Sequence, residues 1–561
     1  MKRYRIAKYF KIGPYGLLMG GMIALAAVLR IALISQNFPL TNSDEGTMGL
    51  MALHIAYHGE FPVFLYGQNY MGVLEAYIGA VLFPIFGPSL FTLRLGMVIL
   101  FSAFQLALYL LISLLYTKRF ALVSISLLCL GSPELFTRQL IAVGGALETL
   151  LFGALTVLLA SYLILSYKDG SSIRKGRIMV YGSLGLVMGL GLWSHILIAP
   201  FAALALLFLL LYCRKELRLP TILTWLLGLL VGLFPALIFD VFHPSQNLPE
   251  AILQAFSSGG TAIKIPYTFW DQLRGTVLVD IPMATGASPI CAIHSTPGAW
   301  RTQITACMVP QGLWGIGFLL LWLIATFLAI REARIRFRFS AGEANQEERQ
   351  ETRRSAARLL LLGSAGLTML AFLISSAPAL VPATSVRYLV GLEAALPAVL
   401  WPLWRSLRLA KSSPTDGGRL TGTAAIISAA ALLCVVGVFL LGTIITFQQS
   451  SVTTAITQQQ EHLIDDLLRL KVTRIYTDYW TCDRLAFLSD ERIICSVVND
   501  GLQPGQNRDT PYVALVRQAP NAAYVFADGA PQIAVLDQRL SRSPQSYRRT
   551  MVDGYIVFQP T

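Results

Sequence analysis

Charged residues are scarce in this chain. They make up 13% of its 561 residues, whereas hydrophobic residues make up 55%, and the mean hydropathy is +0.60. An ordinary soluble domain carries about 25% charged residues, so this composition excludes one. Apolar runs long enough to cross the ~30 Å hydrocarbon core of a bilayer recur as far as residue 446. The sequence therefore predicts a mainly α-helical, polytopic membrane protein.

Two kinds of sequence signal are missing as well. We find no glycine-rich phosphate-binding motif and no internal repeat. Lysine and arginine are also missing between Arg30 and Arg94, although this stretch holds the carboxylates Asp44, Glu45 and Glu60. These acids must find a partner elsewhere: a distant arginine, a metal, or a proton from a substrate.

The net charge of +13 does not indicate a nucleic-acid partner. The basic residues lie in short loops between apolar runs, which is the positive-inside pattern of membrane proteins. A basic tail from Lys2 to Lys11 places the N-terminus in the cytoplasm, and the first apolar run lacks the cleavage site of a signal peptide. We expect this run to be retained and the protein to lie in the plasma membrane.

Counting the apolar runs predicts about thirteen crossings and an external C-terminus. This count includes short passes through 120–130 and 135–147 and leaves Lys118 and Arg119 on the outer face. Residues 1–447 would form the membrane module, with external loops at 36–73 and 243–310. Residues 448–561 would form an external α/β domain with a helix and four strands, at 463–470, 473–477, 492–498, 511–516 and 555–558.

Four of the seven cysteines fall in segments predicted to be external: Cys291, Cys307, Cys482 and Cys495. An oxidising compartment permits disulfides between Cys291 and Cys307 and between Cys482 and Cys495, although the sequence does not fix the pairing. Their spacings do not suggest a zinc site.

Asp44 is the candidate catalytic base, and Glu45 is the second catalytic candidate. The structural alternative is capping, because Thr41-x-x-Asp44 matches a capping box and acids in a first turn complement the helix dipole. The apolar spacing after Asp44 predicts an amphipathic surface helix that ends at Gly59. Capping and catalysis are compatible.

His54 and His58 lie four residues apart on this predicted helix, a spacing that can hold zinc. The residues between them include no glutamate of the kind that zinc proteases use as a base. Interface histidines are the favoured interpretation. No cofactor is assigned, and a divalent metal remains possible.

Further polar groups are candidates for substrate binding. Gln68 and Tyr70 offer groups suited to sugar hydroxyls, and Arg387, beside Tyr388, suits a phosphate. His195 is a weaker candidate for the same phosphate. A turn explains the first pair equally well, and an interface anchor explains the second. Carboxylates near apolar runs indicate a polar cavity among the helices; they are Glu75, Glu148 and Glu393.

The order of several short motifs resembles the start of C-type glycosyltransferases, in the branch of protein O-mannosyltransferases and bacterial aminoarabinose transferases. The motifs are Asp44-Glu45-Gly46, His58-Gly59-Glu60-Phe61-Pro62, Tyr70-Met71-Gly72, Phe86-Gly87-Pro88-Ser89 and Arg94-Leu95. The resemblance covers the chain to about residue 200 in sequence. Gly59 to Pro62 holds one residue more than the family's Gly-x-Pro turn.

The resemblance implies a transferase that takes a sugar from a polyprenyl-phosphate donor on the external face. Asp44 matches the family's catalytic carboxylate, Glu148 its second acidic position, and Arg387-Tyr388 an Arg-Tyr pair before a late span. Glu60 falls within the matched motifs and joins the candidate substrate-binding residues. The acceptor would be a lipid, a glycan or a protein.

Two other functions stay open at this point. A transporter or flippase for lipid-linked glycans also needs a polar cavity, but transporters are often built from repeated halves and we detect no repeat. A catalytically inactive scaffold would bind the lipid-linked sugar without turnover.

Overall fold

The computed structural model describes residues 13–167, 175–244, 265–287, 293, 296–302, 306–339, 346–412, 419–541 and 547–561. The chain divides into two compact units. Unit 1 comprises residues 1–29, 100–139 and 145–446, and unit 2 comprises residues 30–99, 140–144 and 447–561. Four of the described helices contribute residues to both units: α1 (Pro14–Ile34), α4 (Leu90–Leu115), α19 (Arg419–Arg469) and α6 (Pro133–Leu140), of which only Leu140 belongs to unit 2.

Helices and the turns that connect them make up the described residues of unit 1. Its longer helices are α5 (Lys118–Leu127), α6 (Pro133–Leu140), α7 (Ala146–Ser166), α8 (Lys175–Ser194), α9 (Ala199–Cys213), α10 (Leu219–Phe242), α14 (Val309–Phe339), α15 (Gln346–Leu373) and α18 (Leu392–Ser412). Four short helices lie between these: α12 (Phe269–Gly275), α13 (Ile281–Ala284), α16 (Ala377–Leu380) and α17 (Pro382–Ser385).

Within the described residues, nine helices are long and apolar enough to cross a bilayer, or ten if the bent pair 382–389 and 392–410 is one span. The protein is thus a multi-pass membrane protein. The expected count of about thirteen is not confirmed. Two of the expected passes are the helices α5 and α6, of 10 and 8 residues. At 1.5 Å per residue each is about half as long as a bilayer core or less, so neither crosses alone.

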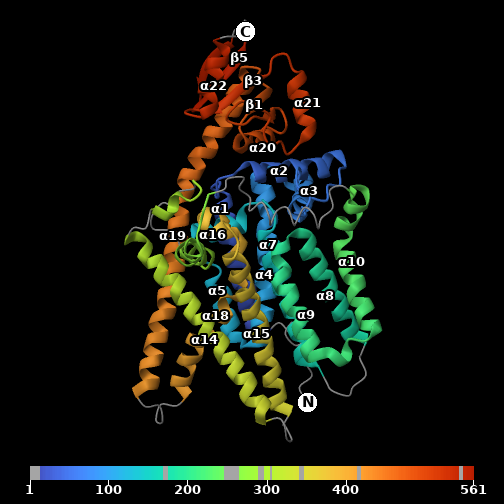
Figure 1. Ribbon diagram of the computed structural model, residues 1–561, viewed down its shortest axis with the longest axis vertical. Coiled ribbons are helices and arrows are strands. Elements are labelled where there is room, and N and C mark those ends of the chain that lie inside the picture. Colours follow the sequence, from blue (N-terminus) through green and yellow to red (C-terminus); the bar gives the residue numbers. More distant parts are fainter. Residues whose placement is uncertain are drawn as a thin grey trace. The chain divides into compact units, whose positions relative to one another are not determined.

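Glycines allow α8 and α10 of unit 1 to pack with their backbones in contact (Figure 1). A Cβ atom at Gly185 would lie 2.0 Å from the carbonyl oxygen of Trp225, and one at Gly228 would lie 2.1 Å from that of Gly182. Small residues at such contacts are how helices associate in lipid, where apolar side chains gain little by leaving the hydrocarbon.

Unit 2 contains a five-stranded sheet of order β2-β1-β3-β5-β4, drawn in orange and red in Figure 1. The first three strands in this order are parallel, and the last two pair antiparallel. The strands are β1 (Arg474–Thr477), β2 (Ile494–Val497), β3 (Ala523–Ala527), β4 (Tyr547–Val552) and β5 (Tyr555–Pro560). Helices α20 (Tyr479–Leu488), α21 (Thr510–Gln518) and α22 (Pro531–Leu540) lie between them in sequence.

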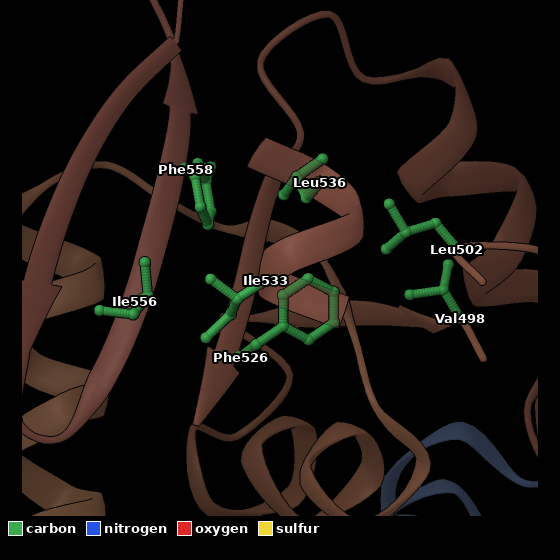
Figure 2. Packing of buried hydrophobic residues seen from close by; sticks show 7 residues of the cluster. All are labelled: Val498, Leu502, Phe526, Ile533, Leu536, Ile556 and Phe558. Atoms are coloured by element: carbon green, nitrogen blue, oxygen red, sulfur yellow. The ribbon is translucent and has the colours of Figure 1, made fainter. Parts of the chain in front are cut away.

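One face of this sheet carries a buried apolar cluster (Figure 2). Phe526 of β3 and Phe558 of β5 meet Ile533 and Leu536 of α22 there, all at most 8% exposed. The cluster confirms an α/β region near the C-terminus. The strand predicted at 511–516 is wrong, because these residues form α21. Strands β3 and β4 were not predicted.

The remaining helices of unit 2 are α2 (Ser43–Leu53) and α3 (Leu74–Phe86). A π-helical turn, His54–His58, continues α2, and Gly59 ends it with φ 72°, a left-handed conformation that glycine adopts without strain. The predicted end of this helix is therefore confirmed.

Helix α2 packs closely on α20. A Cβ at Gly46 would lie 2.5 Å from the carbonyl oxygen of Asp483, and one at Gly49 would lie 2.6 Å from the ring of Phe487. The segment 36–73 and the C-terminal region thus share one compact unit. A disulfide joins Cys482 of α20 to Cys495 of β2, as the sequence permits. The other permitted disulfide lies outside the described residues, which lack Cys291 and the side chain of Cys307.

Candidate functional site

Asp44 lies in the first turn of α2, and its side chain is 20% exposed. Its Oδ1 accepts hydrogen bonds from the hydroxyl of Tyr479 and, at 2.7 Å, from the Nη2 of Arg508. The helix is capped instead by Asn42, whose side chain accepts from the amide of Glu45. The capping box from Thr41 to Asp44, part of the structural alternative, is therefore wrong, although Asp44 and Glu45 do lie in the first turn. The carboxylate of Asp44 faces the C-terminal region.

Arg508 is the centre of this group. Its Nε donates to the hydroxyl oxygen of Tyr479 at 2.8 Å, and its Nη1 donates to the carbonyl oxygen of Tyr66 at 3.3 Å. The side-chain amide of Gln68 faces the same guanidinium, and with its oxygen turned toward Arg508 it accepts hydrogen bonds at 2.8 and 3.1 Å. Gln68 and Asp44 thus both contact Arg508, so a single arginine links the two side chains.

Glu45 has a different environment from its neighbour. It is fully buried, and Arg94 donates to both of its oxygens, at 2.8 and 2.6 Å. The amide of Ala142 donates to the same carboxylate at 3.1 Å. Of the partners that the sequence left open for these acids, the structure shows a distant arginine at both positions: Asp44 pairs with Arg508, and Glu45 pairs with Arg94.

Glu75 supports the same short segment. Its Oε2 accepts from the amide of Gly144 at 2.8 Å, so Glu45 and Glu75 together hold the backbone of residues 142–144. Carboxylates that accept hydrogen bonds from backbone amides stabilise a loop in one conformation. This segment directly precedes α7, whose first turn contains Glu148.

The other candidates of unit 2 lie further along the segment 36–73. Glu60 is exposed and accepts a hydrogen bond from the hydroxyl of Tyr66 at 2.6 Å. Tyr70 is half-buried. His54, His58 and Glu491 form the one group in the described part of the chain that offers histidine and carboxylate ligands together.

Unit 1 contains the remaining candidates. Arg387 is exposed and lies over the ring of Tyr388, 5.1 Å from its centroid. Partial burial and the charge of Arg387 lower the pKa of His195 to about 4, so this imidazole is neutral at physiological pH. His195 accepts a hydrogen bond from the amide of Leu197 at 3.2 Å. Glu148 is fully buried.

Sequence reasoning missed Arg508 and Tyr479. Neither residue lies in a motif, and each is more than 430 positions from Asp44 in the chain. The basic-poor stretch around Asp44 indicated that a partner must come from elsewhere, but it carried no information on which arginine that is.

Solved structures of similar fold were found over nearly the whole chain. The crystal structure of ArnT from Cupriavidus metallidurans bound to undecaprenyl phosphate matches with a TM-score of 0.56 at 13% identity, covering 96% of this chain and 97% of ArnT. The apo oligosaccharyltransferase of Archaeoglobus fulgidus matches with a TM-score of 0.51 at 14% identity, covering 92% and 70%. The chain has the C-type glycosyltransferase fold. This fold confirms the expected architecture, a helical membrane module with a C-terminal α/β region.

Comparisons of sequence give less information than the comparisons of structure. No protein-family model matches the chain. A stretch of 112 residues, 19% of the chain, is 33% identical to subunit GPI15 of the phosphatidylinositol N-acetylglucosaminyltransferase of Saccharomyces cerevisiae. The match spans about half of that protein, 47%.

Proposed function

We propose that this protein is a membrane glycosyltransferase that moves a sugar from a polyprenyl-phosphate donor to an acceptor hydroxyl on the external face of the plasma membrane. The proposal rests on the hydrogen bonds of the Asp44 carboxylate in a chain with the C-type fold. One of its oxygens is held by Arg508 and Tyr479. Its Oδ2 has no hydrogen-bond partner among the described residues, so it is available to an acceptor.

The chemistry needs few groups. A polyprenyl phosphate is a good leaving group, so the acceptor needs a base and the phosphate needs positive charge. Oδ2 of Asp44 takes the hydroxyl proton while the acceptor oxygen attacks the anomeric carbon and the bond to the phosphate breaks. In-line attack inverts that carbon. Arg508 and Tyr479 contribute by fixing the plane of the carboxylate.

We assign the remaining candidate residues roles that suit the chemistry of their side chains. Arg387, beside Tyr388, holds the phosphate through its permanent charge, and neutral His195 adds a hydrogen bond. Gln68, Tyr70, Glu60 and Glu148 bind sugar or acceptor hydroxyls. Glu45, which Arg94 neutralises, is a positioning residue.

The donor class is supported by ArnT, whose structure was solved with undecaprenyl phosphate bound. Residues 1–447 form the membrane module in this proposal, and residues 448–561 form the external domain that supplies Arg508. The cytoplasmic position of the N-terminus follows from its basic tail. The acceptor is a lipid, a glycan or a protein.

The test compares Asp44→Asn with the wild type in membrane vesicles that contain radiolabelled polyprenyl-phosphate sugars. Loss of a general base typically costs 10²- to 10⁴-fold in rate, so we expect transfer to fall at least ~100-fold while binding of the donor persists. Asp466→Asn, which changes an exposed carboxylate of α19, is the matched control and should transfer as the wild type does.

The alternative, a flippase for lipid-linked glycans, predicts a different result. The labelled lipid would change leaflet without losing its sugar, and Asp44→Asn would leave the label on the lipid as in the wild type. Transfer that is undiminished in Asp44→Asn would contradict the assignment of the base.

A further inference from the structure

Two histidines and a glutamate of unit 2 come together away from Asp44. His54 and His58 lie in the π-helical turn that follows α2, and Glu491 lies in the turn that follows α20. One ligand atom from each residue lies within 4.8 Å of the other two. The two histidine rings are stacked, with centroids 5.3 Å apart. Asp44 is ten residues before His54, about 15 Å along a helix.

The hydrogen bonds of His54 decide which nitrogen faces the carboxylate. The Tyr66 hydroxyl donates to Glu60 at 2.6 Å, so its oxygen accepts from the Nδ1–H of His54 at 2.9 Å. The Nε2 of His54 then lies 3.0 Å from the Oε1 of Glu491. A nitrogen and a carboxylate oxygen at this distance share a proton in a hydrogen bond, and a metal ion can take the place of that proton.

The surroundings of the cluster resemble the outer shell of a metal site. A metal-bound histidine usually donates its other ring N–H to a carboxylate, a carbonyl or a similar acceptor, which fixes the ring. Here the Tyr66–Glu60 pair accepts that N–H, and Tyr512 donates its hydroxyl to the Oε1 of Glu491. His54 is 7% exposed and Glu491 is 25% exposed in their side chains, which leaves the exposed His58 on the open side.

The backbone also suits a binding site. Single π-helical turns are uncommon and occur frequently at functional sites. This turn places His54 and His58 on one side, and Gly59 closes it in a left-handed conformation. Ligands around a tetrahedral zinc are about 3.4 Å apart, and the three ligand atoms here lie within 4.8 Å of one another. Small side-chain rotations would therefore bring them to ligand distances.

We propose that His54, His58 and Glu491 bind a zinc ion, with a water as the fourth ligand. Two imidazoles and a carboxylate are a ligand set that Zn²⁺ accepts. The ion replaces the proton between His54 and Glu491 and ties the end of α2 to the turn after α20. The site is structural and separate from the proposed base, since neither Asp44 nor Arg508 is among its ligands.

The test uses zinc alone and the full-length protein in detergent after treatment with a chelator. We expect one zinc per chain to be retained on desalting and the melting temperature to rise with zinc concentration. His58→Ala is the main variant, because its side chain is exposed and loss of a ligand should weaken zinc binding at least ~100-fold. Glu491→Gln should weaken it as well. His462→Ala changes an exposed histidine of α19 in the same unit and should bind zinc as the wild type does.

Melting temperatures of His58→Ala measured without zinc distinguish a purely structural role of His58 from zinc ligation. A merely structural His58 would change the melting temperature equally with and without zinc, whereas a ligand changes the zinc-dependent rise. The proposal is overturned if the wild type retains no zinc, or if His58→Ala and Glu491→Gln bind zinc as tightly as His462→Ala does. Neither result bears on glycosyl transfer by Asp44.

Discussion

Arg508 donates a hydrogen bond to Oδ1 of Asp44 at 2.7 Å, although 464 positions separate the two residues in the chain. The Arg508 side chain is 5% exposed and the Asp44 side chain is 20% exposed. A polar contact at this depth makes the segment 36–73 and the C-terminal region mutually dependent. Truncation of the C-terminal region would therefore remove the only arginine that contacts Asp44 in the described part of the chain.

The first prediction concerns this pair. Breaking a buried ion pair by removing one partner costs about 3 to 5 kcal/mol, and the partial exposure of Asp44 reduces this to about 2 to 3 kcal/mol for Arg508→Ala. Denaturant unfolding in detergent measures the loss. Arg469→Ala removes the exposed partner of Asp466 and should cost less than ~1 kcal/mol. The double variant Arg508→Ala/Asp44→Asn should lose less than the sum of the single losses, and strict additivity would contradict the pairing.

The second prediction concerns Glu45 and Arg94, which are fully buried. Glu45→Gln leaves the Arg94 guanidinium without its counter-charge in the interior, so the free energy of unfolding should fall by about 3 to 5 kcal/mol. Asp44→Asn should cost less, because an amide oxygen still accepts from Tyr479 and Arg508. Unfolding curves of the two variants, measured side by side, give the comparison. An equal loss in both would show that the two acids do not differ in role.

The membrane-spanning helices were more predictable from the sequence than the ion-pair partners of Asp44 and Glu45. Composition and apolar periodicity predicted the spans because a bilayer demands long apolar helices whatever their tertiary contacts. The end of α2 followed from Gly59, since a helix that stops in a left-handed residue favours glycine. The partners of Asp44 and Glu45 did not follow, because ion pairs between distant segments leave no local pattern.

The wrong secondary-structure predictions have local reasons. Residues 511–516 form a short apolar run. Periodicity alone cannot show whether such a run is a helix or a strand. Pro511 at the first turn of α21 was the signal for a helix, because proline suits that position. The passes expected at 120–130 and 135–147 rested on hydropathy, but the structure places helices of 10 and 8 residues there.

The third prediction concerns the contact between α2 and α20. A Cβ at Gly46 would lie 2.5 Å from the backbone oxygen of Asp483, a distance that real Cβ atoms do not tolerate. Gly46→Ala should therefore separate the helices and lower the melting temperature. Gly437→Ala is the matched control, because Gly437 is also helical and nothing lies within 4 Å of its Cβ position. A melting temperature of Gly46→Ala equal to that of Gly437→Ala would contradict this packing.

The fourth prediction is a pH dependence at Asp483, which lies on α20 and is 3% exposed. Burial raises the pKa of this carboxyl from 3.8 to about 6, although the hydroxyl of Thr47 donates to its Oδ2 at 2.6 Å and opposes the shift. The folded state therefore binds a proton more tightly than the unfolded state. The contribution of the protonated Asp483 to the free energy of unfolding is present in full below pH ~4 and is lost as the pH rises through ~6.

Asp483→Asn tests this linkage because an amide does not titrate. Relative to the wild type, the variant should gain stability between pH 4 and pH 7, by up to about 3 kcal/mol for two pKa units, as measured by melting temperature across that range. Thr47→Val removes the hydroxyl that lowers the pKa of Asp483, so the wild-type window should move to higher pH in that variant. A constant difference between Asp483→Asn and the wild type from pH 4 to pH 7 would mean that the buried carboxyl keeps its ordinary pKa.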